Sequence, residues 1–205
     1  IAGTVGDGVG LPFQPIAWRD PAAPTQPLRL PDGFRSGATN DVDADGTIVG
    51  MVTRAGPPGQ QSIDQGYLWK RDGTGRLLPM PEIDGKPAHS LWPISIHNGI
   101  VFGRAITYDA AAMTSHPLLF DLRTERYTML THAFGLVGNS MGWMVREATQ
   151  LSVAAATGRA DLPPLTSAGG AGAAFMSEDG LVIGGKSNDA NGQMQAVRWR
   201  CATTA

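Results

Sequence analysis

The stretch Asp45-Gly46-Thr47-Ile48-Val49-Gly50 decides the fold of this chain, because it joins a turn signal to a short apolar strand that ends in glycine. An Asp-Gly pair suits the two-residue turn of a β-hairpin, whose central residues need positive φ angles. A loop rich in proline and glycine follows, and a second apolar strand ends at Trp69. We therefore interpret the region as antiparallel strands, with a further strand before the turn.

The same arrangement returns along the chain, which indicates a repeat protein. The apolar-apolar-glycine signature occurs at Ile1-Ala2-Gly3, Ile48-Val49-Gly50, Val101-Phe102-Gly103, Leu136-Val137-Gly138 and Val182-Ile183-Gly184. A large or branched apolar residue follows each copy, at Trp18, Trp69, Phe120, Val153 and Trp199. Turn signals precede three copies, at Asp45-Gly46, Asn98-Gly99 and Asp179-Gly180. Four copies close in a short apolar segment, at Leu28–Pro31, Leu77–Pro79, Tyr127–Leu130 and Leu162–Leu165.

One unit thus contains four strands, which we letter a to d, with the signature at strand b and the large apolar residue at the end of strand c. Four strands in about 45–50 residues is the spacing of a β-propeller blade. The sequence predicts an all-β fold, a single five-bladed β-propeller of four-stranded blades. The expected blades cover approximately residues 1–31, 35–81, 91–131, 132–166 and 172–201.

Two parts of the chain depart from the regular unit. The fourth copy is short, so we expect a reduced blade that has lost most of strand a. The chain opens at strand b and closes after strand c, so we expect missing N-terminal strands; the alternative is an open or irregular ring. The stretch from Arg146 to Ala156 has some helical propensity, but it falls on strands b and c, and we interpret it as strand.

Composition excludes several classes of function. The net charge of −2, with basic residues scattered along the chain, gives no case for a nucleic-acid partner. No apolar run approaches the length of about 20 residues that a membrane helix needs, so no membrane insertion is expected. The single cysteine, Cys201, excludes an internal disulfide framework.

The strand-c segments carry a family resemblance. They include Gln65-Gly66-Tyr67-Leu68-Trp69 and His116-Pro117-Leu118-Leu119-Phe120. Together with the hairpin at Asp45–Gly50, they resemble the extracellular HAF-repeat family, whose strand reads close to H-A-F-L-W. Four of the five copies have Gln or Thr in place of the histidine, and the literal His132-Ala133-Phe134 lies outside this register. The resemblance implies a secreted, propeller-like protein with no agreed biochemical role.

Three aspartates form a candidate calcium site. Asp41, Asp43 and Asp45 fit D-x-D-x-D-G, the start of a calcium loop in which alternate carboxylates bind a hard cation. Position twelve of that loop is Val52 instead of the usual glutamate, and the Asp-Gly end belongs to the repeated hairpin. Calcium is therefore a weak candidate, and no other cofactor is expected.

The candidate ligand-binding residues lie on or near one expected face. This face combines the d–a connections with the b–c loops, at Asp7–Gln14, Arg54–Gln65, Tyr108–His116 and Asn188–Gln195. We place Trp92 on a d–a connection, where it either stacks on a ligand or caps the core, and His97 in a hairpin that either faces the central channel or meets solvent. The full set of candidates is Arg54, Trp92, His97, Arg104, Tyr108 and Trp143.

The first functional hypothesis is a secreted, non-catalytic recognition module that binds a glycan or a protein through this loop face. The second is a glycosidase or lyase that uses channel carboxylates, which requires Asp43, His97 and Glu178 to converge on one cavity. The third is a docking subunit of a larger secreted assembly. No nucleophile, phosphate-loop or metal-protease motif occurs in the sequence.

Overall fold

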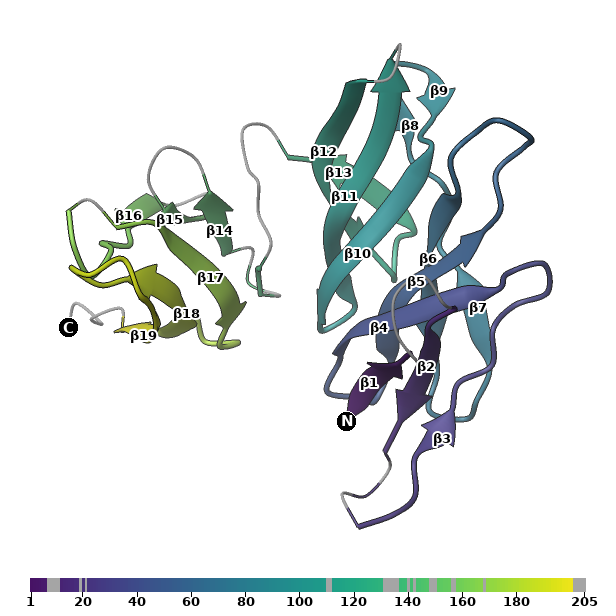
Figure 1. The fold of residues 1–205 in the computed structure, drawn as a ribbon, viewed down its shortest axis with the longest axis horizontal. Helices are drawn as coiled ribbons and strands as arrows, with labels where there is room; N and C mark the ends of the chain where they lie inside the picture. Colours follow the sequence, from purple (N-terminus) through teal and green to yellow (C-terminus); the bar gives the residue numbers. More distant parts are fainter. Residues whose placement is uncertain are drawn as a thin grey trace.

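A computed structural model describes residues 1–6, 12–18, 20, 22–109, 112–130, 137–139, 141, 143–147, 151–155, 158–167 and 169–200. Every regular element in these ranges is a β-strand, which confirms the all-β prediction (Figure 1). No helix in the described part of the chain is long and apolar enough to span a bilayer.

The described strands form five antiparallel sheets of three or four strands and one two-stranded hairpin, each built from strands consecutive in sequence. Sheet 1 contains β1 (Ala2–Val5), β2 (Gln14–Ala17) and β3 (Gln26–Pro27). Sheet 2 contains β4 (Ser36–Val42), β5 (Ile48–Arg54), β6 (Ile63–Trp69) and β7 (Gly75–Leu77). Sheet 3 contains β10 (Ser90–His97), β11 (Ile100–Asp109), β12 (Ala112–Asp121) and β13 (Arg126–Met129). Sheet 4 contains β14 (Met144–Glu147), β15 (Leu151–Ala155) and β16 (Gly158–Asp161), and sheet 5 contains β17 (Ala171–Met176), β18 (Val182–Asn188) and β19 (Met194–Arg200).

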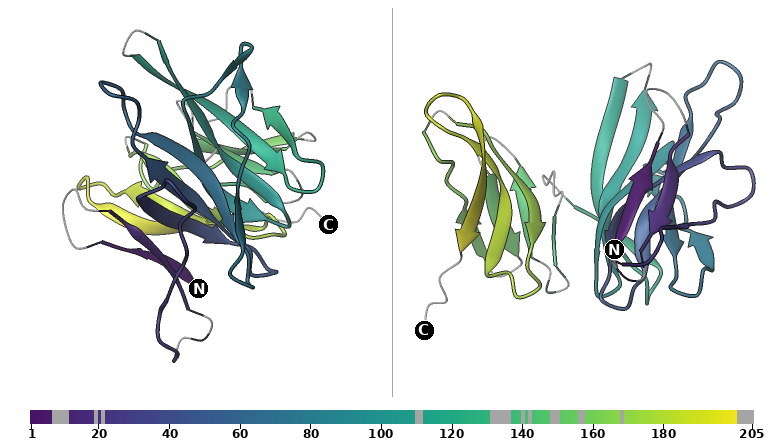
Figure 2. Two further views of the ribbon diagram at one scale, coloured as in Figure 1. Left: turned by 90° about the vertical axis from the view of Figure 1, so that its right-hand side faces the viewer. Right: turned by 60° about the horizontal axis from the view of Figure 1, so that its bottom comes forward.

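A two-stranded hairpin, β8 (Glu82–Ile83) and β9 (Lys86–Pro87), lies in the connection between sheets 2 and 3. Among the described strands, sheets 2 and 3 alone have the four strands expected of every unit. Sheets 1 to 3 lie together, and sheets 4 and 5 form a second group (Figures 1 and 2). In the part of the chain that the structure describes, no hydrogen-bonded strand pair joins sheet 1 to sheet 5.

The core lies between consecutive sheets. Along β5, Ile48 and Val52 pack in the cluster shared with sheet 1, whereas Val49 packs in the cluster shared with sheet 3. A strand that buries both faces needs a continuous apolar run instead of an alternating one, which explains the apolar pair before each glycine. A third cluster, which includes Val145 and Ile183, joins sheets 4 and 5.

The register of sheet 4 differs from the prediction. We expected Leu136-Val137-Gly138 to be strand b, but the Val145 N–H donates to the Val137 carbonyl at 2.8 Å and Gly138 bridges Met144. The described part of this segment therefore comes before the hairpin, in the place of strand a, and β14 takes the place of strand b. In the described part of this segment, strand a is represented by this isolated bridge. The strands β14 and β15 confirm the strand interpretation of their part of 146–156.

The repeated glycine faces a β-bulge in the neighbouring strand. The register of β4 on β5 shifts between Thr39 and Asp41, and the same shift occurs in β10 and β17. A Cβ atom added to Gly50 would lie 2.0 Å from the Ala38 carbonyl oxygen, because the bulged strand approaches closely. In sheet 5 the equivalent residue is Gly185, one position after the glycine of the sequence signature.

The hairpin turns are of two kinds. Asn98 and Gly99 both have positive φ, at 45° and 77°, as the predicted type I′ turn requires. The other two turns differ from the prediction, since Gly46 and Gly180 have positive φ but the aspartates before them do not. In these turns the glycine N–H donates back three residues, to Asp43 and to Ser177, which makes a longer loop of the type I kind.

Aromatic side chains of strands c and d tie the second, third and fifth units to the unit before each of them. The indole N–H of Trp69 donates to the Arg29 carbonyl of the preceding unit at 2.9 Å, and that of Trp199 donates to the Pro163 carbonyl at 2.8 Å. Phe120 has no such donor, and there the hydroxyl of its cross-strand partner Tyr127 donates to the Pro79 carbonyl at 2.6 Å. We call these three bonds the aromatic struts.

The strut of sheet 3 predicts an alkaline loss of stability. Burial raises the pKa of the Tyr127 hydroxyl above its value in the unfolded chain. The stabilisation is therefore fully present below about pH 10 and is lost as pH rises, because the unfolded chain releases the proton first. The free energy of unfolding of the wild type should exceed that of Tyr127→Phe by about 1 kcal/mol at pH 8, with a smaller difference at pH 11. Urea unfolding at both pH values measures this, and a difference that grows with pH would contradict it.

Candidate functional site

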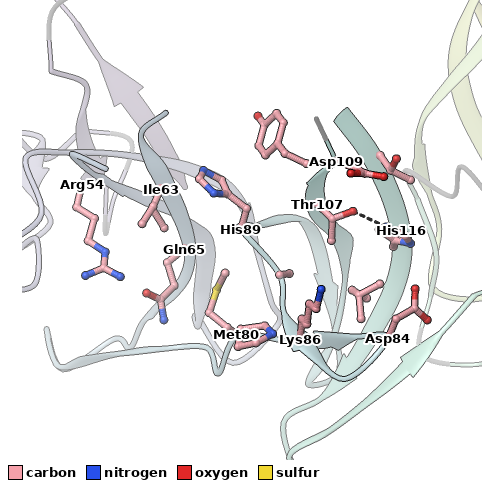
Figure 3. A pocket seen from close by; sticks show the side chains of 15 residues that line it. Arg54, Ile63, Gln65, Met80, Asp84, Lys86, His89, Thr107, Asp109 and His116 are labelled. Atoms are coloured by element: carbon pink, nitrogen blue, oxygen red, sulfur yellow. Dashed lines mark hydrogen bonds between the residues drawn. The ribbon is translucent and has the colours of Figure 1, made fainter. Parts of the chain in front are cut away.

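A cavity of about 820 Å³ opens between sheets 2 and 3 (Figure 3). Its walls are the end of β5 with the start of β6, and the end of β11 with the start of β12. The connection that carries β8 and β9 completes it. The cavity therefore lies where the b–c loops and a d–a connection were expected to form one face.

Histidine and tyrosine side chains shape the middle of the cavity. The Nε2 atom of His89 lies 3.0 Å from the Ser62 carbonyl oxygen, so the ring spans from the connection to the wall of sheet 2. The rings of His89 and Tyr108 meet edge to face with centroids 4.9 Å apart. On the other wall, Nε2 of His116 lies 2.9 Å from the Thr107 hydroxyl (Figure 3). These contacts fix the rings before any ligand binds.

Four charged side chains surround these rings. Arg54 lies on the sheet 2 side, with its guanidinium carbon 5.9 Å from the centre of the Phe34 ring. Asp84 and Lys86 come from the β8–β9 hairpin, and Asp109 from the end of β11. Asp84 has φ 51° and Gly85 has φ 75°, so the turn between β8 and β9 is a further hairpin turn with two positive φ angles. The Asp-Gly pair marks this turn in the sequence.

Two of the six predicted ligand-binding residues, Arg54 and Tyr108, line the cavity together. Lys186, which lies in β18 near a predicted b–c loop, lines a separate hollow of about 650 Å³ in sheet 5. The predictions missed His89, His116 and the β8–β9 hairpin. The Asp84-Gly85 pair was the available signal for the hairpin, whereas nothing in the sequence places the two histidines beside one cavity.

Trp92 does not lie on a connection, as we had placed it, but inside β10, where it pairs across the sheet with Arg104. The side chain is half-buried, and its indole N–H donates to the Asp64 carboxylate of sheet 2 at 2.9 Å. Trp92 therefore joins two sheets. Trp143 is likewise half-buried and packs against the core shared by sheets 4 and 5.

His97 ends β10 and lies among carboxylates from other sheets. Its Nδ1 atom is 3.7 Å from a carboxylate oxygen of Glu178, and its Nε2 atom is 4.0 Å from one of Asp41, with 25% of the His97 side chain exposed. The Asn98 side-chain amide donates to Glu178 at 3.0 Å. The hairpin ends of sheets 2, 3 and 5 thus meet here, away from the cavity between sheets 2 and 3.

The D-x-D motif of β4 binds the backbone of sheet 3. Asp41 accepts the Ile96 N–H at 2.9 Å, and the two carboxylate oxygens of Asp43 accept the N–H groups of Asn98 at 2.9 Å and Gly99 at 2.7 Å. Asp45 instead accepts the N–H and hydroxyl of Thr47 within its own turn. Within the described ranges, no three His, Cys, Asp or Glu side chains gather as a metal site. Calcium stays a prediction.

Asp43→Ala should lower the free energy of unfolding by about 2 kcal/mol, because it leaves two N–H groups of sheet 3 without their charged acceptor. Asp45→Ala is the matched control from the same motif, and it should cost less than about 1 kcal/mol, since its carboxylate bonds only within an exposed turn. Urea unfolding compares the two variants. Equal losses would show that Asp43 does not join the sheets.

Similar chemistry holds the hairpin of sheet 5. The Ser177 hydroxyl and the Leu181 N–H donate to Asp179, and these bonds lower the pKa of that carboxyl group below its ordinary value. The Asn139 amide of sheet 4 donates to the Glu178 carbonyl at 3.0 Å.

Cys201 and His132-Ala133-Phe134 lie outside the described residues.

Small antiparallel sheets of consecutive strands, packed on one another in sheets 1 to 3 and again in sheets 4 and 5, are typical of propeller-type β proteins. No family model and no curated protein matches the sequence. The chain is similar to the crystal structure of TolB from Acinetobacter baumannii, with a TM-score of 0.61 and 11% sequence identity. The likeness covers 97% of this chain and 49% of that one, so it shows the fold, and the chain spans about half the length of TolB.

Proposed function

We propose that this chain is a non-catalytic recognition module of a secreted protein, with its five sheets as blades of one propeller, and that it binds a glycan or a protein partner. The cavity between sheets 2 and 3 is the observation that carries the proposal. Its volume of about 820 Å³ falls in the range of ligand sites. It lies on the side where loops, which vary most easily, meet from two units.

The chemistry of the lining supports binding over catalysis. Thr107 and His116 bond each other, and His89 contacts Tyr108 and a backbone carbonyl. In the described lining there is no serine or cysteine nucleophile beside a histidine. Hydroxyl, imidazole and amide groups around a half-buried aromatic ring suit the polar surface of a glycan or a peptide.

The enzyme hypothesis retains one specific observation. His97 lies 3.7 Å from Glu178, and Asp43 reaches the same hairpin through the backbone N–H groups of Asn98 and Gly99, which occupy both of its oxygens. Hydrolysis of a panel of polysaccharides that His97→Ala abolishes would favour the enzyme. Absence of turnover with wild-type protein would leave the recognition module.

A glycan array and a display library of peptides, both probed with the purified chain, test the recognition module. Ligands from either source should lose affinity in Tyr108→Ala by about tenfold, because truncation of an aromatic anchor removes its packing. Lys70→Glu is the control, since Lys70 is exposed and lines a hollow on the opposite end of sheet 2. Ligands that bind both variants as they bind the wild type would place the site elsewhere.

A further inference from the structure

The charges around the cavity between sheets 2 and 3 are divided between its walls. Arg54 lies on the sheet 2 side, and Asp84 and Asp109 lie on the opposite side, with Lys86 between them (Figure 3). All four side chains are exposed, and none forms an ion pair within the described part of the chain. The cavity therefore has a positive charge at Arg54 on one side and a net charge of −1 on the opposite side, where Lys86, from the same hairpin as Asp84, offsets one of the two carboxylates.

This division selects among ligands. Charges on the walls of a concave site produce a stronger field than the same charges on a flat surface. A ligand with one kind of charge gains at one wall and loses at the other, and a neutral ligand gains little from either. A ligand with opposite charges at its two ends gains at both walls.

The remaining lining fits a peptide between those ends. Ile63, Met80 and Ile83 contribute apolar surface. The side-chain N–H of Gln65 already donates to the Leu78 carbonyl at 3.2 Å, which leaves its carbonyl oxygen to accept a peptide N–H. We propose, building on the recognition function above, that the cavity binds an extended peptide segment with an acidic side chain toward Arg54 and a basic side chain toward Asp109 and Asp84.

The experiment uses three libraries of capped hexapeptides: one with an acidic and a basic residue fixed at opposite ends in both orders, one with two acidic ends and one with neutral ends. We expect selection from the first library. Arg54→Glu and Asp109→Lys should each weaken the selected peptide by about tenfold at low salt, and less at high salt where charges are screened. Lys70→Glu should leave binding within about twofold.

The decisive step is a charge exchange. The double variant Arg54→Glu with Asp109→Lys should bind a peptide in which the acidic and basic residues are exchanged at least as well as it binds the original peptide. Circular dichroism and thermal unfolding verify that these exposed substitutions leave the fold intact.

The outcomes separate this inference from the proposed function. Peptides or glycans that depend on Tyr108 but not on Arg54, Asp109 or salt would overturn the divided-charge inference and keep the recognition function. Absence of any ligand that responds to a cavity variant would overturn both. Selection of the doubly charged peptides with restored binding in the double variant would establish the inference.

Discussion

Replacing Gly50 with alanine should lower the free energy of unfolding by about 3–5 kcal/mol, the largest effect we expect from a single methyl group in this protein. The added Cβ would meet the Ala38 carbonyl oxygen at 2.0 Å and the Thr39 Cα at 2.9 Å. Both obstacles are backbone atoms, so no side-chain rotation relieves them. The bulge of β4 would have to move, together with the D-x-D motif that binds sheet 3.

The matched control is Gly170→Ala. An added Cβ at Gly170 meets nothing within 4 Å, so its effect should stay within about 0.5 kcal/mol. Thermal unfolding should show a midpoint about 10 °C lower for Gly50→Ala than for the control. Similar midpoints for the two variants would mean that the close approach of strands a and b is not a property of the protein in solution.

Trp69→Ala should cost about 3–5 kcal/mol, because the side chain is only 1% exposed and fills the core between sheets 1 and 2. Trp69 packs edge to face with Tyr67 at 4.8 Å and carries the strut to Arg29. The truncation would therefore remove a large apolar volume and leave the Arg29 carbonyl without its donor.

Trp69→Phe separates these two contributions. Phenylalanine, the residue at the equivalent position 120 of sheet 3, keeps most of the apolar volume but has no N–H. The free energy of unfolding should therefore fall by about 1–2 kcal/mol. Urea unfolding of both variants gives the comparison. A loss in Trp69→Phe as large as in Trp69→Ala would show that the hydrogen bond, and not the packing, dominates this position.

Much of the fold could be predicted from repeated local signals. The apolar pairs predicted strands b, the large apolar residues predicted the ends of strands c, and Asn98-Gly99 predicted its turn type correctly. Strand b of the fourth unit was assigned to the wrong segment because an apolar pair before a glycine suits strand a as well as strand b, and only pairing distinguishes them. The bulges are contacts between two backbones, and no residue type marks them in the sequence.

The candidate site could be predicted only in part. Arg54 and Tyr108 were found because they lie on loops whose side of the fold follows from strand order. Trp92 was misplaced because β10 begins earlier than the turn signal suggested, so that Trp92 falls inside the strand. The D-x-D motif predicts a cation site because carboxylate oxygens suit a positive partner, and that prediction stays open. The bonds from Asp41 and Asp43 to backbone N–H groups of sheet 3 could not be predicted, because no residue type marks them in the sequence.

The aromatic struts have a mechanical consequence. Each strut joins one unit only to the unit before it in the chain, so a force applied to the two ends loads the struts in series and the weakest yields first. Repeat proteins held by nearest-neighbour contacts come apart by units, not all at once. Stretching a single molecule should therefore give separate unfolding steps, each of which lengthens the chain by one unit. Trp69→Phe should lower the unfolding force of one step and leave the forces of the others unchanged.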